Sequence, residues 1–359
     1  MPEPIKQALE KARAEANIMP KSQLKKILKK EYGENWKEKF AQFDEKPFAA
    51  ASIGQVHNAL SHKGEKMAIK IQYPGVAESI DSDLNNIKNL FNLFKIFPKG
   101  LYIEDLIKNL GSELRMECNY IEEAQKQMEF KKMFEEDSFF YVPEIKNEYC
   151  SNLILASEFV EGDNVDELDN FPQETRDKIG GKILELCLRE LFEFNYMQTD
   201  PNPANFFYDP VKDRINLIDF GAARKFDKEF VDTYMKIVHA AAINDKDTLI
   251  EYSKKIGFLN GQENQIMLDS HANATLAVGE PFNINNEEIF DFGNQKLTQR
   301  IYKLLPLMLK HRLKAPPTEV YSLHRKLSGA YLICIKLKSR VRSKKMFFDL
   351  YNQFYKGRI

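Results

Sequence analysis

Three polar residues near the middle of the chain are the strongest candidates for chemistry. Asp200 and Asn205 lie in YMQTDPNPANFFY with the spacing D-x-x-x-x-N, and Asp219 follows in INLIDFG. This arrangement is typical of phosphoryl transfer, in which one aspartate accepts a proton from an attacking hydroxyl or orients it. The asparagine and the second aspartate can supply oxygen ligands to Mg²⁺. A lone D-x-x-x-x-N match more often lies in a solvated loop, but the short hairpin and second aspartate favour a functional site.

Lys70, in MAIKIQ, is a further candidate because it lies on an expected strand. Its neighbours Ile69 and Ile71 would point to the opposite face, which lets the lysine reach phosphates across a cleft. An ordinary edge lysine is the alternative.

The segment FAAASIGQVH, just upstream of Lys70, is a candidate phosphate cradle. Small residues let a backbone approach a nucleotide closely. The segment is not a G-x-G-x-x-G loop, and alanine restricts φ more than glycine does, so phosphate positioning should differ. Its small residues are Ala49, Ala50, Ala51, Ser52 and Gly54.

A lysine that reaches phosphates needs an anionic partner to fix its direction. Glu123, in ECNYIEEAQKQM, borders the helix face that carries Tyr120, Ala124 and Met128. Glu117 sits about two turns earlier and could reach the same cleft. Solvent exposure is the alternative for either glutamate, and the residues alone leave both readings open.

A second Asp-Phe-Gly occurs at Asp291-Phe292-Gly293. It follows the acidic, polar run NNEEIF instead of a buried strand, and nothing like a catalytic loop precedes it. We interpret it as a helix-entry loop.

Strands and helices must position these residues. Hairpin signals alternate with helical stretches of period near 3.6 in the first half, and the chain after Phe226 is almost wholly helical. The expected elements are a hairpin at 56–72, helices from 76 to about 136, a strand at 152–160, a helix at 173–194 and a hairpin formed by NFFY and RINLID. We predict three parts: a helical amino-terminal extension (1–45), an N-lobe with inserted helices (46–160) and a mainly helical C-lobe (161–359).

The charge balance narrows the class of partner. The chain has 52 Lys and Arg against 53 Asp and Glu, a formal net charge of -1. A globally basic nucleic-acid binder is therefore excluded as the default, and we expect no nucleic-acid partner. The four cysteines form no C-x-x-C pair, which argues against a disulfide scaffold or a zinc ribbon and fits a reducing compartment.

The sequence shows no membrane span and no targeting segment. No run approaches the roughly 18 apolar residues that a spanning helix needs. The amino end lacks the apolar core of a signal peptide and carries Glu3, Glu10 and Glu15, unlike an acid-poor transit peptide. We expect a helix from Pro4 to Ala16.

Five segments together resemble the UbiB (aarF-domain) family of atypical protein-kinase-like proteins. The likeness runs from about residue 1 to the carboxyl end and is closest to the mitochondrial members that support coenzyme Q (ubiquinone) biosynthesis. It implies a two-lobed, protein-kinase-like α+β fold with family-specific helices, and an enzyme, a phosphotransferase or ATPase, that uses ATP or ADP with Mg²⁺. The segments are FAAASIGQVH, AIKIQYPGV, ECNYIEEA, MQTDPNPANFFYDP and INLIDFGAAR.

The resemblance also implies roles for residues that match the family's motifs. Asp200 corresponds to the catalytic aspartate, Asn205 and Asp219 to the metal ligands, and Lys70 pairs with Glu123. The alanine-rich loop replaces the glycine-rich loop and restrains ordinary kinase activity. The residues expected to meet the nucleotide are Phe48, Ala49, Ala50, Ala51, Ser52, Lys70, Glu117, Glu123 and, at the hinge, Ser157, Glu158, Phe159 and Val160.

The chain departs from the family pattern in two places. The family's E-x-D pair is matched by Glu117 and Asn119, so one carboxylate is lost near the phosphates, which could change metal occupancy or nucleotide preference. The family's K-x-G-Q segment does not occur, and we expect it, with the transit peptide and any membrane anchor, to lie upstream of residue 1.

The substrate is expected to be small. Gln198-Thr199-Asp200 replaces H-R-D, and GAARKFDKEF runs directly into a helix, without a long activation segment or A-P-E. We therefore predict ATP hydrolysis, or phosphorylation of a small or lipid-like molecule, in coenzyme Q biosynthesis. The alternative is a catalytically weak nucleotide-binding scaffold that stabilises a biosynthetic complex.

A basic tract near the carboxyl end bears on location. A solvated helix face is the favoured interpretation. Attraction to anionic lipid, about 1 kcal/mol per basic residue, is the alternative. It would suit the family's place at the periphery of the mitochondrial inner membrane, with other coenzyme Q biosynthesis proteins as candidate partners. The tract comprises Lys336, Lys338, Arg340, Arg342, Lys344 and Lys345.

Overall fold

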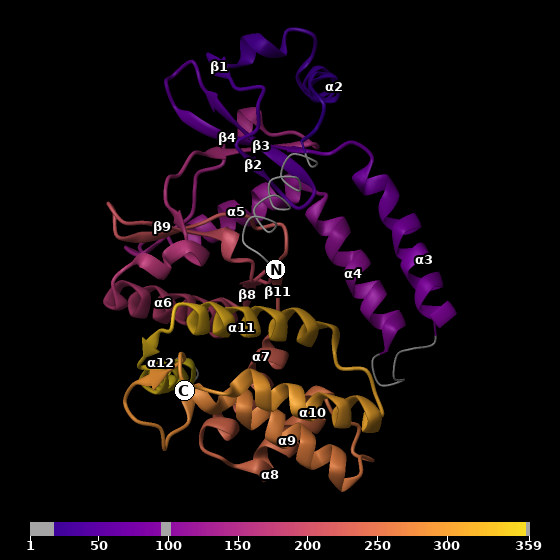
Figure 1. The fold of residues 1–359 in the computed structure, drawn as a ribbon, viewed down its shortest axis with the longest axis vertical. Coiled ribbons are helices and arrows are strands. Elements are labelled where there is room, and N and C mark those ends of the chain that lie inside the picture. Colours follow the sequence, from indigo (N-terminus) through magenta and orange to yellow (C-terminus); the bar gives the residue numbers. More distant parts are fainter. Residues whose placement is uncertain (1–17, 95–101, 357–359) are drawn as a thin grey trace, which may run out of the picture. The chain divides into compact units, whose positions relative to one another are not determined.

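The computed structural model describes residues 18–94 and 102–356 (Figure 1). These residues form two compact units. The first contains 18–87, 110–162 and 207–222, and the second contains 88–94, 102–109, 163–206 and 223–356. The expected helix from Pro4 to Ala16 lies outside the described residues. The assignment of an extension and two lobes with boundaries at 45 and 160 stays a prediction.

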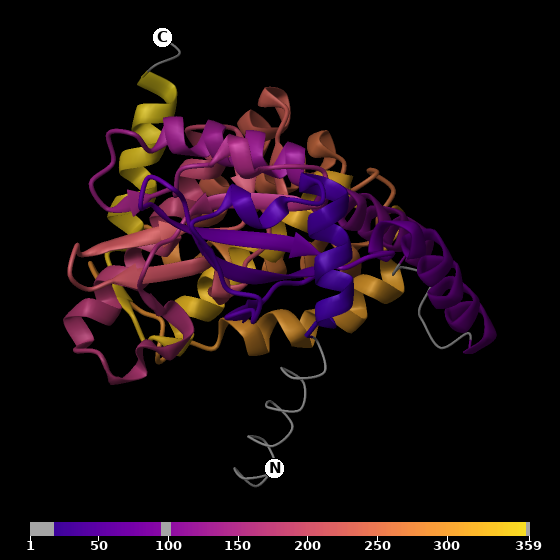
Figure 2. The same cartoon turned by 90° about the horizontal axis from the view of Figure 1, so that it is seen from above.

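An antiparallel sheet forms the core of the first unit, and its strands lie side by side (Figure 2). Its order is β1-β3-β4-β6, and β2 pairs with the outer end of β3. The predicted hairpin is confirmed, since Val56 of β3 lies opposite Lys70 of β4. The strands are β1 (Gln42–Phe43), β2 (Ala49–Ala50), β3 (Gly54–Leu60), β4 (Lys66–Gln72) and β6 (Ile154–Glu158).

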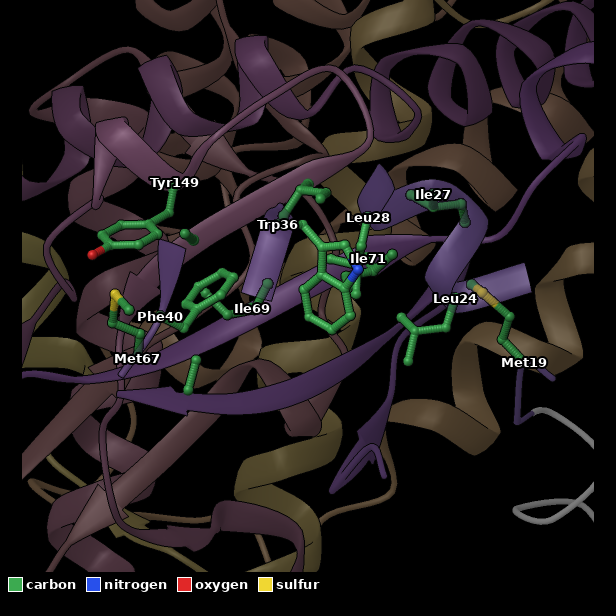
Figure 3. Close-up of a cluster of buried hydrophobic side chains, with 13 residues drawn as sticks. Met19, Leu24, Ile27, Leu28, Trp36, Phe40, Met67, Ile69, Ile71 and Tyr149 are labelled. Atoms are coloured by element: carbon green, nitrogen blue, oxygen red, sulfur yellow. The ribbon is translucent and has the colours of Figure 1, made fainter. Parts of the chain in front are cut away.

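Strand alternation decides which way Lys70 points. Ile69 and Ile71 are fully buried in an apolar cluster on one face of β4. The helix α2 (Lys21–Tyr32) and the short helix η1 (Trp36–Lys39) cover this face. Figure 3 shows the indole of Trp36 among the aliphatic side chains of this cluster. Because neighbouring side chains on a strand alternate, Lys70 is directed to the other face.

Three longer helices follow the hairpin. They are α3 (Val76–Phe94), α4 (Ile103–Glu117) and α5 (Tyr120–Met133). Asn119 is the N-cap of α5, and its Oδ1 accepts a hydrogen bond from the N–H of Glu122 at 3.1 Å. Asparagine and aspartate cap helices about equally well, so Asn119 keeps this structural role while contributing no charge.

A smaller sheet carries the second predicted hairpin. Its order is β5-β10-β9, and β10 runs parallel to β5. Asp209 fixes the turn, because its Oδ1 accepts from the N–H groups of Val211 and Lys212 at 3.0 and 3.1 Å. The strands are β5 (Phe140–Tyr141), β9 (Phe206–Asp209) and β10 (Arg214–Leu217).

The second unit is mainly helical, and α9 and α10 lie side by side in it (Figure 1). No helix among the described residues is both long enough and apolar enough to cross a membrane. Short strands also occur: β8 (Tyr196–Gln198) pairs with β11 (Ala223–Lys225), and β12 (Phe290–Asp291) pairs with β13 (Arg340–Val341). The helices are α6 (Gln173–Phe192), α7 (Lys228–Ala242), α8 (Lys246–Ile256), α9 (Gln265–Gly279), α10 (Leu297–His311), α11 (Thr318–Lys336) and α12 (Ser343–Lys356). Short 3-10 helices also occur among the described residues: η3 (Asn147–Tyr149), η4 (Val165–Asn170), η5 (Pro203–Asn205), η6 (Glu280–Phe282) and the η1 already named.

The second Asp-Phe-Gly differs in part from the expected helix-entry loop. Asp291 ends the strand β12, and its Oδ1 then accepts from the N–H of Gly293 at 2.8 Å before α10 begins. Phe292 is fully buried and packs on Phe290 with ring centroids 4.9 Å apart. The segment does lead into a helix, but a strand of two residues leaves no alternating pattern in the sequence that could predict it.

Candidate functional site

Lys70, Glu123 and Asp219 come together in the first unit. The Nζ of Lys70 donates to Glu123 Oε1 at 2.9 Å, to Glu123 Oε2 at 3.1 Å and to Asp219 Oδ2 at 3.3 Å. The side chain of Glu123 is 1% exposed, that of Lys70 13% and that of Asp219 28%. Glu123 therefore contacts the lysine, as the family resemblance implies, although helix spacing alone left its exposure open.

The charges of this cluster depend on one another. Burial by itself would lower the pKa of Lys70, but attraction to Asp219 and Glu123 raises it well above its ordinary value. Burial raises the pKa of Glu123 to about 7, against the opposing attraction of Lys70. The Nζ of Lys70 also lies 5.1 Å from the centroid of the Tyr120 ring, a cation–π contact. Lys70 is therefore a cation at neutral pH, which is the form that binds phosphate.

One face of α5 holds the Asp219-Phe220-Gly221 segment. Glu123 accepts a hydrogen bond from the N–H of Phe220, and the Nζ of Lys126 donates to the carbonyl oxygen of Gly221 at 3.0 Å. The ring of Phe130 packs on Phe220 with centroids 4.8 Å apart. Lys126 and Phe130 were not identified from the sequence. Their spacing from Glu123, i+3 and i+7, places all three on one helix face and is the signal that could have identified them.

Asp219 has an unusual backbone conformation. Its φ is 70°, in the left-handed region that few residues other than glycine adopt. Its Oδ1 accepts from the N–H of Gly221 at 3.2 Å, which is the local hydrogen bond that lets aspartate tolerate this region. Such conformations concentrate where a side chain must be aimed at a ligand.

The alanine-rich loop lies near the same helices. Ser52 Oγ donates to Glu117 Oε2 at 3.1 Å, so Glu117 contacts the loop while Glu123 contacts the lysine. Ala49 and Ala50 form the exposed strand β2. Phe48, which is 49% exposed, meets Phe159 edge-to-face with centroids 5.6 Å apart. Two of the predicted nucleotide-binding segments therefore touch through their aromatic rings.

Two backbone N–H groups of the predicted hinge are already hydrogen-bonded within the first unit. The N–H of Glu158 donates to the carbonyl oxygen of Glu144 at 2.8 Å, and that of Phe159 donates to Lys66 at 3.1 Å. Ser157 lies in β6, opposite Ala68 of β4.

Asp200 and Asn205 contact each other in the second unit. The Nδ2 of Asn205 donates to Asp200 Oδ2 at 2.8 Å, and the N–H of Asn202 donates to Asp200 Oδ1 at 3.3 Å. Asn202 also caps the short helix η5 (Pro203–Asn205), accepting from Ala204 at 3.1 Å. These bonds aim the Asp200 carboxylate and leave the side-chain carbonyl oxygen of Asn205 on the other side of its amide.

A buried ion pair supports this loop. Lys326 of α11 lies 3.2 Å from Glu190 of α6, and their side chains are 2% and 1% exposed. Glu190 accepts a hydrogen bond from the N–H of Gln198, and the Nζ of Lys326 lies 5.1 Å from the ring centroid of Phe206. The pair therefore contacts both ends of the 198–206 loop. This pair could not be predicted from sequence patterns, because its members lie far apart in the chain.

Other residues of α11 contact the same loop. Arg325 Nε donates to the carbonyl oxygen of Thr199 at 3.4 Å. Gly329 packs directly on Pro201, since a Cβ at Gly329 would overlap the proline Cβ. Downstream, the predicted absence of a long activation segment agrees with the described residues: β11 pairs with β8, and α7 begins at Lys228 with Asp227 as its N-cap.

The chain is similar to known proteins along nearly its whole length. The family model for the ABC1 atypical kinase-like domain matches residues 11–253. The chain is 45% identical over 350 residues to "Atypical kinase COQ8B, mitochondrial" of Danio rerio, covering 98% of this chain and 56% of that protein. It is 44% identical over 361 residues to "Atypical kinase coq-8, mitochondrial" of Caenorhabditis elegans, covering 99% and 48%. The chain thus spans about half the length of these two relatives.

A solved structure is also similar. The complex of Rv3197 with erythromycin from Mycobacterium tuberculosis matches with a TM-score of 0.71 and 27% sequence identity, over 97% of this chain and 86% of that one. The predicted kinase-like α+β fold is confirmed. Since the family model covers more than half of the chain, the chain belongs to the ABC1 atypical kinase-like family, also called UbiB.

Proposed function

We propose that this protein is a magnesium-dependent enzyme, a phosphotransferase or ATPase, that uses ATP or ADP and acts in coenzyme Q biosynthesis. The observation that carries the proposal is Lys70, a cation held at 2.9 Å by a buried glutamate and at 3.3 Å by Asp219. A lysine fixed in this way presents a positive charge where nucleotide phosphates can bind, and Asp219 is the more accessible of its partners.

The residues present fit Mg²⁺. Asn205 directs its amide nitrogen to Asp200, so its neutral carbonyl oxygen is the atom it can offer to a cation. Asp219 adds a carboxylate, and Mg²⁺ prefers oxygen ligands while retaining waters and substrate phosphates. We propose that Asn205 and Asp219 hold the ion, which when bound would neutralise charge on the phosphates.

Asp200 is the proposed catalytic residue. Its carboxylate is oriented by hydrogen bonds from Asn202 and Asn205. A carboxylate that holds or deprotonates a nucleophile needs such a fixed orientation. The nucleophile is water or the hydroxyl of a small or lipid-like molecule. The short connection between β11 and α7 supports this choice, because it offers no extended platform for a peptide.

The relatives' names support a mitochondrial setting, and we propose a protein peripheral to the inner membrane that works with other coenzyme Q biosynthesis proteins. The basic tract contributes little to that placement. Lys336 pairs with Asp166 at 2.6 Å, Arg340 with Asp177 at 2.9 Å and Arg342 with Glu288 at 3.1 Å. Lys345 pairs with Asp349 at 2.5 Å. These partners favour the interpretation of the tract as an ion-paired helix surface.

The proposal is tested by Asp219→Asn, with Asp291→Asn as the matched control in the second Asp-Phe-Gly. The wild type and Asp291→Asn should show a thermal shift with Mg²⁺ and ATP, and should release ADP. Asp219→Asn should lose ADP release by a factor of at least about 100, as expected when a charge-stabilising group is removed. Equal activity in Asp219→Asn and the wild type would contradict the proposed role.

A second candidate, a catalytically weak nucleotide-binding scaffold, is favoured by the stiff alanine loop and by the uncharged Asn119. It predicts a nucleotide-dependent thermal shift that Asp219→Asn reduces, with no ADP release by the wild type. The same two measurements therefore separate the two candidates.

A further inference from the structure

An apolar cavity lies inside the second unit, apart from the residues proposed to bind nucleotide. It has a volume of about 310 Å³ and is lined mainly by residues of α6, α7, α9, α10 and α11. Cavities of this size hold small molecules, and an apolar lining selects apolar ones. Its walls include Leu191, Ile237, Ala274, Val278, Phe282 and Leu327.

One part of the wall is polar. Arg312, Tyr321 and His324 all line the cavity. The Tyr321 hydroxyl is buried and has no hydrogen-bond partner among the described residues. Within 18–94 and 102–356, no carboxylate forms an ion pair with Arg312. A buried hydroxyl without a partner costs about 1–3 kcal/mol, so this wall is incomplete without a group that accepts its hydrogen bond.

We propose that the cavity binds an apolar chain that ends in a single carboxylate, a fatty-acid-like molecule. The chain would be buried against the aliphatic wall, and the carboxylate would accept from the Tyr321 hydroxyl and face the Arg312 guanidinium. A carboxylate matches this wall because it accepts several hydrogen bonds and places a negative charge opposite the guanidinium of Arg312, whose electrostatic neighbours include Tyr321 and Tyr102.

The same helix connects the cavity with the Asp200 loop. Tyr321, His324 and Leu327 of α11 line the cavity, while Arg325 and Gly329 of α11 contact the loop at Thr199 and Pro201. Met197 also lines the cavity and lies three residues before Asp200 in the chain. Ligand binding in the cavity is therefore placed to alter the loop, although the binding itself does not depend on the proposed function.

The test measures binding of dodecanoate and of dodecanol, its uncharged counterpart, to the full chain by calorimetry and thermal shift without nucleotide. Dodecanoate should bind at least about tenfold more tightly than dodecanol. Arg312→Gln should reduce that preference to less than about threefold, and the control Arg342→Gln, whose arginine lies on the exposed surface, should preserve it.

Two further variants locate the site. Ala274→Phe would fill the cavity and should abolish binding of both ligands. Tyr321→Phe keeps the shape of the cavity and should weaken dodecanoate while leaving dodecanol unchanged, so the test does not depend on Ala274→Phe folding. Absence of dodecanoate binding, or an unchanged preference in both Arg312→Gln and Tyr321→Phe, would overturn the proposal. Because no nucleotide is present, either result leaves the proposed ATP chemistry to be judged by the Asp219→Asn experiment.

Discussion

Two lysine–glutamate pairs, one in each unit, use the same chemistry in different surroundings. Lys70 and Glu123 lie 2.9 Å apart in the first unit, and Lys326 and Glu190 lie 3.2 Å apart in the second. Both glutamates are 1% exposed, and burial raises the pKa of each to about 7.

The pairs differ in what else the lysine contacts. Lys70 is 13% exposed and has a second acidic partner, Asp219, which is 28% exposed. Lys326 is 2% exposed and faces the ring of Phe206. A lysine that shares its charge with an accessible carboxylate can exchange that partner for a phosphate, whereas an enclosed pair can only support the chain around it. A buried salt bridge is thus not by itself evidence of a ligand site; accessibility decides its role.

The largest expected effect is the loss of stability in Lys326→Met. It leaves Glu190 buried without its cation, which should cost about 3–5 kcal/mol of unfolding free energy. Lys70→Met should cost less, because water can reach that cluster, but should remove the nucleotide-dependent thermal shift. Urea unfolding followed by far-ultraviolet circular dichroism measures both. The double variant Lys326→Met with Glu190→Leu should recover most of the lost unfolding free energy. A greater loss in Lys70→Met than in Lys326→Met would contradict this difference between the two pairs.

The second prediction concerns the burial of His271 in the second unit, which disfavours its protonated form. Burial lowers the pKa of His271 to about 4, while its Nε2 contacts Ser253 Oγ at 2.9 Å. Below about pH 6.5 the unfolded chain binds a proton at this histidine that the folded protein does not, so stability is greatest above pH 6.5 and falls as the pH falls towards 4. The loss should reach about 3 kcal/mol, at 1.36 kcal/mol per pH unit.

The measurement for His271 is the midpoint of urea unfolding between pH 7 and pH 4.5. His271→Asn should flatten the decline, and His62→Asn, a change at an exposed histidine of the first unit, should leave it unchanged. Equal slopes in all three proteins would show that His271 is not enclosed as the structure describes.

The third prediction concerns packing around the loop that the enclosed pair supports. Gly329→Ala places a Cβ against Pro201, and overpacking of this kind should cost about 1–3 kcal/mol. It should also slow ADP release, because Pro201 adjoins Asp200. The matched control is Gly181→Ala in α6, where the nearest atom, Val341 Cγ1, would be 3.5 Å away. That change should be neutral or stabilising by about 0.5–1 kcal/mol, since alanine favours helix. Equal effects of the two alanines in thermal unfolding would contradict this packing.

The smallest expected effect is at an exposed ion pair. Arg342 and Glu288 lie 3.1 Å apart, but their side chains are 65% and 69% exposed. Arg342→Gln should change the unfolding free energy by about 0–1 kcal/mol, and the change should shrink further at high salt. A loss as large as that of Lys326→Met would mean that exposure does not separate the two kinds of pair.

The residues that carry the candidate chemistry could be read from local patterns. The alternation around Lys70 predicted its direction, and the hairpins at 56–72 and 206–217 followed from turn residues between apolar runs. Two-residue strands such as β12 could not be predicted, because they are too short to show a period.

The sequence by itself determined the longer strands and helices and the types of residue available for phosphate and metal chemistry, because these depend on neighbours within a few positions. The tertiary structure brings the Glu123 carboxylate to Lys70 and the Glu117 carboxylate to Ser52, a distinction that helix spacing alone does not make. It also decided the pairing of Glu190 with Lys326 and the cavity beside α11. Burial and the contacts that compensate for it arise only when distant segments pack together, and no local spacing encodes them.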